Sequence, residues 1–488
     1  MFPEVNKMEK EDIKSKTLKG FLWRFGERLS SQLVSFIVSI ILARLLMPKE
    51  YGIIALTMVF INIASVLAIS GLGTSLIQKK DADDLDFSTM FHAGNAFSLL
   101  LYVILFMAAP FIADLYDNEL IQPVLRILGV VIPISSINSI QQASVSRKLE
   151  FKKFFYATFI GTLVSGAVGV FMAYWGMGVW ALVGQQLTSQ IVNTFTLNRI
   201  ITWRPQLRFS YQRFKSLFSF GSKYMGANVI GTFFNEFKSF VIGIKYQPAD
   251  LAFYNRGESL PSLLSNNINN TINAVLFPVM SKVQDDPEAI KRAVRRAMMT
   301  SSFVMCPILL GLAATSDKVV LILLTGKWMF CVPFMQVLCF QYLFGILGTA
   351  NLQALNALGR SDVTLKLELI KKPIYLLLII IGVFISPLAI AIANTCYGFI
   401  GTAINAWPNR KLVRYSFKEQ LKDVSPQFGL GMIMGGVVYL IGLLPLNIYF
   451  ILLMQVGTGV CVYLGMAKLF SLESYHYVVN TIRSIRKK

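Results

Sequence analysis

Residues 21–52 read FLWRFGERLSSQLVSFIVSIILARLLMPKEYG, and this stretch decides the fold class. Its apolar run is long enough to cross a bilayer, which takes about 20 residues in a helix. Yet Arg24, Glu27 and Arg28 lie in the first turns of the run. Charged groups within a membrane normally face a protein interior or a water-filled cavity, because exposure to hydrocarbon costs about 3 kcal/mol or more. The stretch therefore predicts a membrane helix that borders a charged cavity.

The composition of the whole chain is that of a membrane protein. Of its 488 residues, 55% are apolar and only 15% are charged, whereas roughly a quarter are charged in an average soluble domain. A net charge of +20 would also suit a protein that binds nucleic acid. However, the Lys and Arg residues lie in short loops between apolar runs, as in the positive-inside pattern of membrane proteins. We therefore predict no nucleic-acid partner.

Apolar segments of about 20 residues or more recur along the chain, each long enough to cross a core of about 30 Å. We predict about fourteen of them. Val319–Trp328 is apolar but too short to cross, so we expect a partly inserted segment on the outer side. Lys and Arg cluster in alternate loops, which predicts an even number of spans with both termini in the cytoplasm. The predicted spans are 21–46, 51–77, 88–112, 120–143, 153–175, 179–201, 215–243, 250–280, 290–315, 331–357, 361–385, 387–408, 425–445 and 448–470.

Two stretches of the first half reappear in weaker form in the second. Pro48–Gly52 (PKEYG) is echoed by Pro248–Ala252 (PADLA), and Ile140–Ala143 (IQQA) by Asn351–Ala354 (NLQA). Repeats with an even number of helices have the same orientation in the membrane. We predict an all-α polytopic membrane protein with two six-helix bundles and a C-terminal pair. The expected segments are a cytoplasmic N-terminal segment (1–20), the first bundle (21–201), a cytoplasmic linker (202–214), the second bundle (215–408), a second linker (409–424), the helix pair (425–470) and a basic cytoplasmic tail (471–488).

Charged residues inside the predicted spans are mostly basic, so a cavity that they line would favour an anionic guest such as a pyrophosphate. Arginine suits bidentate contact with phosphate, and lysine acts as a point charge. A structural role stays open for each residue, as an internal salt bridge or a snorkelling side chain; for the lysines near position 371, Glu368 is the rival partner. Glu27 and Glu236 are candidates for a carboxylate that tunes or couples the site. The cationic candidates are Arg24, Arg28, Lys223, Lys238, Arg256, Lys371 and Lys372.

A strip of amides, Asn266, Asn269, Asn270 and Asn273, lies in the span that begins near residue 250. We expect it to face sugar or water, and hydrogen bonding between helices is an equal alternative. No catalytic constellation, phosphate-binding loop or metal motif is present, and two histidines alone cannot build a metal site. The sequence predicts a protein that is not an enzyme and has no cofactor or metal, while coupling to H⁺ or Na⁺ stays open.

Several motifs of the chain are familiar as a set. They are Ala43–Leu46, Pro48–Gly52, Gly71–Gly73 with the acidic loop to Phe87, Gly178–Trp180, Gln185–Leu187, Phe218–Lys223, Tyr254–Arg256, Leu276–Pro278, Gln284–Asp286 and Ala357–Asp362. With them the chain resembles the bacterial polysaccharide-export flippases, the Wzx group, and most closely the WzxC-like lipopolysaccharide and colanic-acid exporters. The resemblance covers nearly the full length to about residue 425. These proteins belong to the multidrug/oligosaccharidyl-lipid/polysaccharide superfamily.

The resemblance implies a flippase in the inner (cytoplasmic) membrane. Its substrate would be an undecaprenyl-pyrophosphate-linked oligosaccharide, moved from the inner to the outer leaflet by alternating access between two helical bundles. A polysaccharide polymerase and export machinery would be further partners. One alternative is a cation-coupled multidrug antiporter of the same superfamily, which would favour acidic residues in its cavity. Another is a membrane polymerase or glycosyltransferase, which would need a sizeable outer loop.

Overall fold

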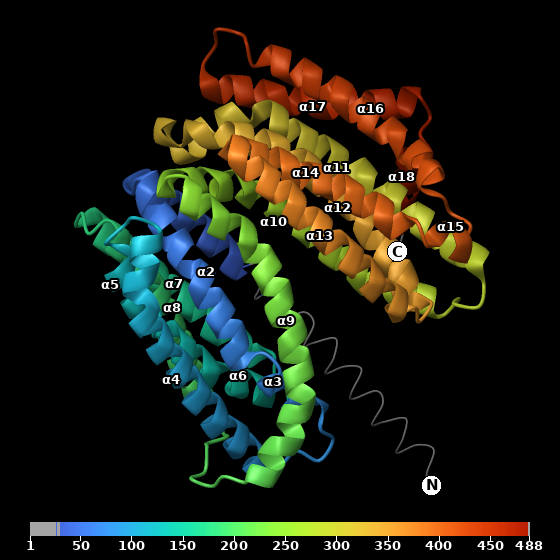
Figure 1. Cartoon of the computed structure of the whole chain (residues 1–488). Helices are drawn as coiled ribbons and strands as arrows, with labels where there is room; N and C mark the ends of the chain where they lie inside the picture. Colours follow the sequence, from blue (N-terminus) through green and yellow to red (C-terminus); the bar gives the residue numbers. More distant parts are fainter. Residues whose placement is uncertain (1–25, 27–29, 487–488) are drawn as a thin grey trace. The chain divides into compact units, whose positions relative to one another are not determined.

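The computed structural model describes Gly26 and residues 30–486, and every regular element within these residues is a helix (Figure 1). The all-α fold class predicted from the sequence is thus confirmed. The chain divides into two compact units, Met1–Leu251 and Ala252–Lys488, which we call unit 1 and unit 2.

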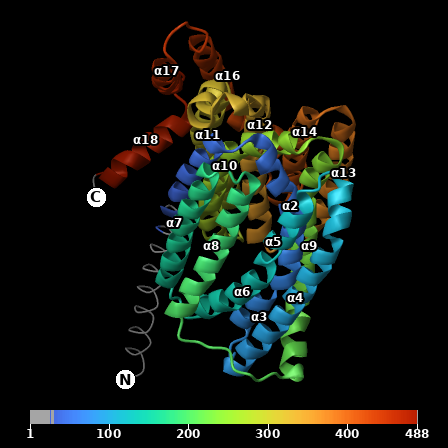
Figure 2. The same ribbon diagram turned by 90° about the vertical axis from the view of Figure 1, so that its left-hand side faces the viewer.

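Unit 1 begins with the helix Ser30–Leu45. Helices α7 and α8 form an antiparallel hairpin, and α9 packs against α2, α3 and α4 (Figures 1 and 2). The helix α9, which the sequence assigned to a second bundle, therefore contacts helices of unit 1. The later helices of this unit are α2 (Pro48–Ile69), α3 (Leu72–Gln78), α4 (Asp84–Leu115), α5 (Ile121–Leu128), α6 (Val131–Arg147), α7 (Lys152–Tyr174), α8 (Val179–Ile200) and α9 (Tyr211–Lys245).

The boundary between the units falls in the first turn of α10, so most of that helix belongs to unit 2. Within unit 2, α12 packs on α14, and α11 packs on both α12 and α16. The elements are α10 (Pro248–Ser281), α11 (Pro287–Leu324), the 3-10 helix η1 (Gly326–Cys331), α12 (Val332–Ala357), α13 (Ser361–Ile385), α14 (Pro387–Ala406), α15 (Asn409–Leu412), α16 (Phe417–Ile441), α17 (Ile448–Leu469) and α18 (Glu473–Arg486).

Nine helices in the described residues are long and apolar enough to cross a membrane. The predicted spans from 51–77 onward overlap helices, although 51–77 covers both α2 and α3 and 120–143 covers both α5 and α6, and the count of about fourteen stays a prediction. Of the first predicted span, 21–46, the structure describes Gly26 and residues 30–46. One expectation needs a correction. Val319–Trp328 is not a separate inserted segment, because α11 continues through most of it to Leu324 before η1 begins. Lys318 Nζ lies 2.6 Å from Asp317 Oδ2, so the two charges near the C-terminal end of this long helix are paired. The predicted span 290–315 ends just before this pair.

The repeated stretches at Pro48 and Pro248 are two copies of one kind of helix start. Proline occupies the first turn of α2 and of α10, where its missing N–H removes no helical hydrogen bond. An acid then accepts from the main chain ahead of the helix. Glu50 Oε2 accepts from Met47 N at 2.6 Å, and Asp250 Oδ2 accepts from Gln247 N at 3.1 Å. The sequence repeat therefore records a shared capping geometry.

Glycine allows two close approaches of main chain in unit 1. A Cβ on Gly52 would lie 1.8 Å from the carbonyl oxygen of Pro248, so any side chain there would force the starts of α2 and α10 apart. Gly71, between α2 and α3, has φ +88° and would place a Cβ 2.1 Å from the carbonyl oxygen of Gly221 on α9. Its left-handed conformation is readily available only to glycine. These contacts explain the glycines in two of the motifs that carried the resemblance.

A cluster of charged residues joins the ends of α3, α4, α6 and α9. The fully buried carboxylate of Asp86 lies 2.6 Å from Lys79 Nζ and 3.2 Å from a guanidinium nitrogen of Arg213. Arg213 also pairs with Asp83, and Arg147 donates to carbonyl oxygens at and beyond the C-terminal end of α3. We call this cluster the clamp, and its members are Lys79, Asp83, Asp86, Arg147 and Arg213.

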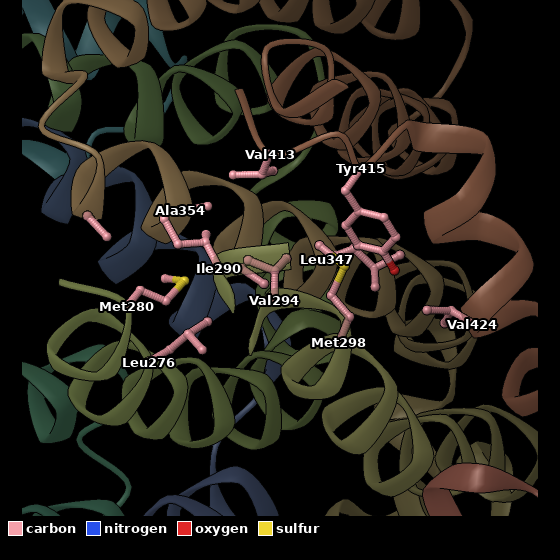
Figure 3. Packing of buried hydrophobic residues seen from close by; sticks show 12 residues of the cluster. Leu276, Met280, Ile290, Val294, Met298, Leu347, Ala354, Val413, Tyr415 and Val424 are labelled. Carbon is pink, nitrogen blue, oxygen red and sulfur yellow. The ribbon is translucent and has the colours of Figure 1, made fainter. Parts of the chain in front are cut away.

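A hydrophobic core in unit 2 holds the short connection between α14 and α16 (Figure 3). Val413 and Tyr415 from this connection are buried against residues of α10, α11, α12 and α16. The labelled members from those helices are Leu276, Met280, Ile290, Val294, Met298, Leu347, Ala354 and Val424.

Buried amides fix the same connection. Asn409 donates to Asn351 Oδ1 at 2.7 Å, and Gln420 Nε2 donates to that oxygen at 3.0 Å. Asn351 in turn donates to Gln420 Oε1 at 2.8 Å. All three side chains are almost fully buried. Because an unpaired buried amide costs about 1–3 kcal/mol, this network favours one arrangement of α12, α15 and α16.

Candidate functional site

The first group of predicted site residues, Arg24, Glu27 and Arg28, lies outside the described residues. Their part in a charged cavity stays a prediction.

On α9 the predicted charges have different surroundings. Glu236 accepts a hydrogen bond from Asn62 on α2 at 2.9 Å, so this carboxylate links two helices of unit 1. Lys223 is exposed and Lys238 is half-buried. Phe60, two residues before Asn62, and Phe240, two residues after Lys238, pack edge to face, with ring centroids 6.2 Å apart. In unit 1, the predicted acid Glu236 thus has a defined hydrogen-bond donor on α2.

On α13 two lysines share one carboxylate. Lys371 is only 5% exposed, and its Nζ lies 2.5 Å from Glu368 Oε1. Lys372 Nζ lies 3.9 Å from the other oxygen of Glu368. A Cβ added to Gly401 on α14 would lie 3.7 Å from Lys371 Cδ, which places the lysine stem against that helix. The alternative in which these lysines pair with Glu368 is therefore seen in the structure.

The charges at the start of α10 have partners of another kind. The guanidinium of Arg256 lies 5.1 Å from the ring centre of Trp328 on η1, a distance suited to a cation–π contact. Glu258 accepts from the hydroxyl of Tyr342 at 3.0 Å. The contact with Trp328 gives Arg256 a packing role, and its part in a cationic cavity stays a prediction.

The amide strip on α10 is partly bonded and partly exposed. Asn266 and Asn270 are exposed, whereas Asn269 Nδ2 donates to Ser265 at 3.3 Å. Asn273 accepts from Gln353 of α12 at 2.9 Å. Both readings of the strip, interhelical bonding and a polar surface, therefore describe part of it.

Asn273 also borders a polar hollow of about 470 Å³ in unit 2. The other lining residues are Gln353, Asn356, Gly359 and Ser361, at the ends of α12 and α13. Amide and hydroxyl groups of this kind can donate to and accept from sugar hydroxyls. The sequence analysis used the stretch around Gln353 only as evidence for a repeat. Its clustered amides were the signal that could have placed it in the site.

A second groove, also about 470 Å³, runs between α11, α16 and α17 and is almost wholly apolar. Pro307, Met434 and Val438 are among its lining residues. Three polar side chains of the lining donate to main-chain carbonyls: Gln455 to Val438 at 2.9 Å, Tyr463 to Phe303 at 3.0 Å and Thr315 to Gly311 at 2.9 Å. This groove can accept a hydrocarbon chain. The sequence predicts α16 and α17 only as an appended helix pair and assigns them no part in a site.

Within the described part of the chain, no group of three or more His, Cys, Asp or Glu residues could hold a metal ion.

The fold is similar to that of two kinds of solved transporter. The lipid II flippase MurJ, in its inward closed conformation, matches with a TM-score of 0.76 at 14% sequence identity, over 95% of this chain and 100% of that one. An inward-facing multidrug resistance transporter of the MATE family matches with a TM-score of 0.61 at 13% identity, over 79% of this chain and 94% of that one. These likenesses establish the fold.

Three curated relatives carry names from polysaccharide biosynthesis. The lipopolysaccharide biosynthesis protein WzxC of Escherichia coli (strain K12) is 24% identical over 374 residues, 76% of each chain. The succinoglycan biosynthesis transport protein ExoT of Rhizobium meliloti is 23% identical over 62% of each chain. The teichuronic acid biosynthesis protein TuaB of Bacillus subtilis is 25% identical over 61% of this chain and 62% of its own.

These similarities confirm the resemblance drawn from the sequence motifs. A family profile described as "Polysaccharide biosynthesis protein" matches residues 41–333, more than half of the chain, and the protein belongs to this family.

Proposed function

We propose that this protein is a flippase for undecaprenyl-pyrophosphate-linked oligosaccharide repeat units. It moves them from the inner to the outer leaflet of the bacterial cytoplasmic membrane by alternating access, for export of a surface polysaccharide. The family assignment and the names of the relatives support a role in glycan export. The likeness to MurJ supports a fold capable of flipping lipid-linked sugars.

The observation that carries the proposal is the pair of lysines on α13. Lys371 and Lys372 place two basic side chains beside Glu368 on a helix that we expect to span the membrane, and Lys371 is buried. A cation held away from water is costly unless it meets an anion. A pyrophosphate would supply that anion and would bind more strongly there than in bulk water. Lys223 and Lys238 of α9, with Arg24 and Arg28, are the remaining candidates for this cationic lining.

The two hollows of unit 2 fit the other parts of such a substrate. The apolar groove between α11, α16 and α17 suits the isoprenoid chain. The polar hollow that Asn273 and Gln353 border suits the sugars. With a cationic site for the pyrophosphate, each chemical part of a lipid-linked oligosaccharide has a surface of matching character.

The cation-coupled antiporter is disfavoured by the acids of the described spans. Glu236, Glu258 and Glu368 accept from Asn62, Tyr342 and Lys371 respectively. An antiporter for organic cations needs carboxylates that face its cavity and exchange partners. We propose Glu27 as the first candidate for coupling to H⁺ or Na⁺ and Glu236 as the second. If Glu27→Gln leaves the ion dependence of transport unchanged, Glu27 has no coupling role.

We also propose the finer topology that the sequence predicts. It comprises about fourteen spans with both termini in the cytoplasm, two bundles of about six helices each, and an appended pair. A polysaccharide polymerase and export machinery would act on the delivered repeat units.

A complementation experiment tests the proposed function. A deletion strain should accumulate lipid-linked repeat units on the inner side and lose surface polysaccharide, and the wild-type gene should restore export. The variant Lys371→Gln/Lys372→Gln should restore export at least about tenfold less well, which corresponds to about 1.4 kcal/mol. Lys366→Gln, an exposed lysine on the same helix, should behave as wild type.

The amount of each variant in the membrane, measured by immunoblot, separates loss of transport from loss of protein. Lys371→Arg keeps the charge and should recover part of the export. Loss of surface polymer without accumulation of lipid-linked units would contradict the flippase assignment and favour a polymerase.

A further inference from the structure

A third groove of unit 2, lying between α14 and the start of α16, is apolar along most of its length and basic at one end. Its volume is about 660 Å³, and its lining includes Phe399, Ile404 and Phe417. Trp407 also lines the groove and is 67% exposed. Exposed tryptophan is enriched where a membrane meets water, since its ring lies at the level of the lipid headgroups. The groove therefore has the apolar body and the interfacial edge that a membrane lipid requires.

The basic end belongs to the connection between α14 and α16, residues 407–418, which we call the basic connector. Arg410 and Lys418 line the groove, and Lys411 and Arg414 lie between them in the chain. All four side chains are exposed. Among the residues that the structure describes, none of the four takes part in an ion pair. The groove thus ends in positive charge that the protein itself does not balance.

The acids that could balance this charge are already engaged by α11. Glu419 lies 3.7 Å from Lys291 Nζ. Asp423 accepts from Arg295 at 3.0 Å and from the Tyr415 hydroxyl at 2.7 Å. These pairs hold α16 against α11, and within the described residues neither carboxylate forms an ion pair with Arg410, Lys411, Arg414 or Lys418.

The connector is also held in place without any ligand. Asn409 is fully buried and bonded to Asn351, and Val413 and Tyr415 pack in the core shown in Figure 3. Rigid placement lowers the entropy that a ligand must give up on binding. The basic side chains therefore extend from a fixed main chain beside the groove.

We propose that this groove binds an anionic phospholipid. One acyl chain lies along α14 against Phe399 and Ile404, and the phosphate lies between Arg410 and Lys418. The guanidinium can hold two phosphate oxygens at once, and the ammonium adds a point charge. Basic pockets between membrane helices on the cytoplasmic side are typical sites for anionic headgroups. In the proposed topology, with both termini in the cytoplasm, the bound lipid belongs to the inner leaflet. The lining of this groove shares no residue with the two hollows assigned to the transported substrate, and lipid binding does not rest on the flippase activity.

Native mass spectrometry of the full-length protein in detergent tests the proposal. Phosphatidylglycerol and phosphatidylcholine with the same acyl chains are added in turn. Wild type should retain phosphatidylglycerol in preference to phosphatidylcholine. Arg410→Gln/Lys418→Gln should weaken phosphatidylglycerol binding by about thirtyfold, since each of the two basic residues contributes about 1 kcal/mol near an anionic headgroup.

The control variant is Arg208→Gln/Lys215→Gln. It removes one Arg and one Lys that are likewise exposed, on the stretch around the start of α9, and it should leave phosphatidylglycerol binding unchanged. A second variant tests the apolar part of the groove and leaves every basic residue unchanged. Ala403→Phe puts a ring into the groove and should also weaken retention, with thermal unfolding in lipid-free detergent showing that the variant is folded.

Three results would overturn the assignment. They are equal binding of the two phospholipids, equal effects of the groove variant and its control, and tighter binding of undecaprenyl phosphate than of phosphatidylglycerol. Failure of the flippase function would appear in the complementation experiment and would leave these binding results unchanged.

Discussion

The clamp of unit 1 and the basic connector of unit 2 both gather basic residues at helix ends, but they balance the charge in opposite ways. In the clamp, Arg213 and Lys79 both face the buried carboxylate of Asp86. In the connector, the nearby acids are paired with α11, and Arg410 and Lys418 face a groove. Counting Lys and Arg residues in the loops, as the positive-inside rule does, cannot distinguish the two regions.

The difference teaches that basic loops in a membrane protein can have two separate roles. Basic side chains that pair with a buried acid hold helix ends together, because removing the acid would leave their charges without partners. A connector whose bases have no partner depends on the core beneath it for its position and leaves the charge available for a ligand. The two roles predict opposite results when single charges are removed.

The largest expected effect is the loss of Asp86. Asp86→Ala should lower the free energy of unfolding by about 2 kcal/mol, less than for a fully buried ion pair, since Lys79 and Arg213 are each about one third exposed. Thermal unfolding of the purified protein in detergent measures the change. Asp84→Ala, an exposed acid two residues earlier, is the matched control and should be nearly neutral. Equal midpoints for the two variants would contradict the clamp.

The sequence could predict the helices because the length and apolar composition of each segment can be read without knowing its tertiary contacts. It also revealed the repeat at Pro48 and Pro248, where proline and an acid two positions apart record a capping pattern. It could not predict the full length of α11. The predicted span ends at residue 315, whereas the helix continues past the paired Asp317 and Lys318 to Leu324.

The candidate site was predictable only where partners are close in the chain. Glu368 lies three and four positions from the two lysines of α13, so the pairing could be foreseen. Asp83 and Arg213 are 130 positions apart, and the bonds between Asn351 and Asn409 depend on how α12 meets α15. No periodic pattern encodes such pairs. The acidic loop entered the analysis as a family motif, and the clamp supplies its physical reason.

A smaller effect should appear at acid pH. The hydrogen bond from Arg213, with one from the main-chain N–H of Asp86, lowers the pKa of Asp83 from 3.8 to about 2. Because the folded value is the lower one, the ionised carboxylate stabilises the fold above about pH 4, and this contribution is lost as the pH falls towards 2. Unfolding midpoints measured from pH 5 to pH 3 should fall more for wild type than for Asp83→Asn. The same slope in both proteins would show that Asp83 is not held by Arg213 in solution.

The smallest effect should come from the connector. Lys411 and Arg414 carry exposed charges outside the groove lining, so Lys411→Gln/Arg414→Gln should change the free energy of unfolding by no more than about 0.5 kcal/mol. Arg213→Gln in the clamp removes one charge and should cost about 1 kcal/mol, since Asp86 would keep only Lys79. Thermal unfolding of both variants in the same detergent makes the comparison direct. If Lys411→Gln/Arg414→Gln lowers the free energy of unfolding as much as Arg213→Gln does, ion pairs hold the connector in place. Its basic side chains would then not be available to a lipid phosphate.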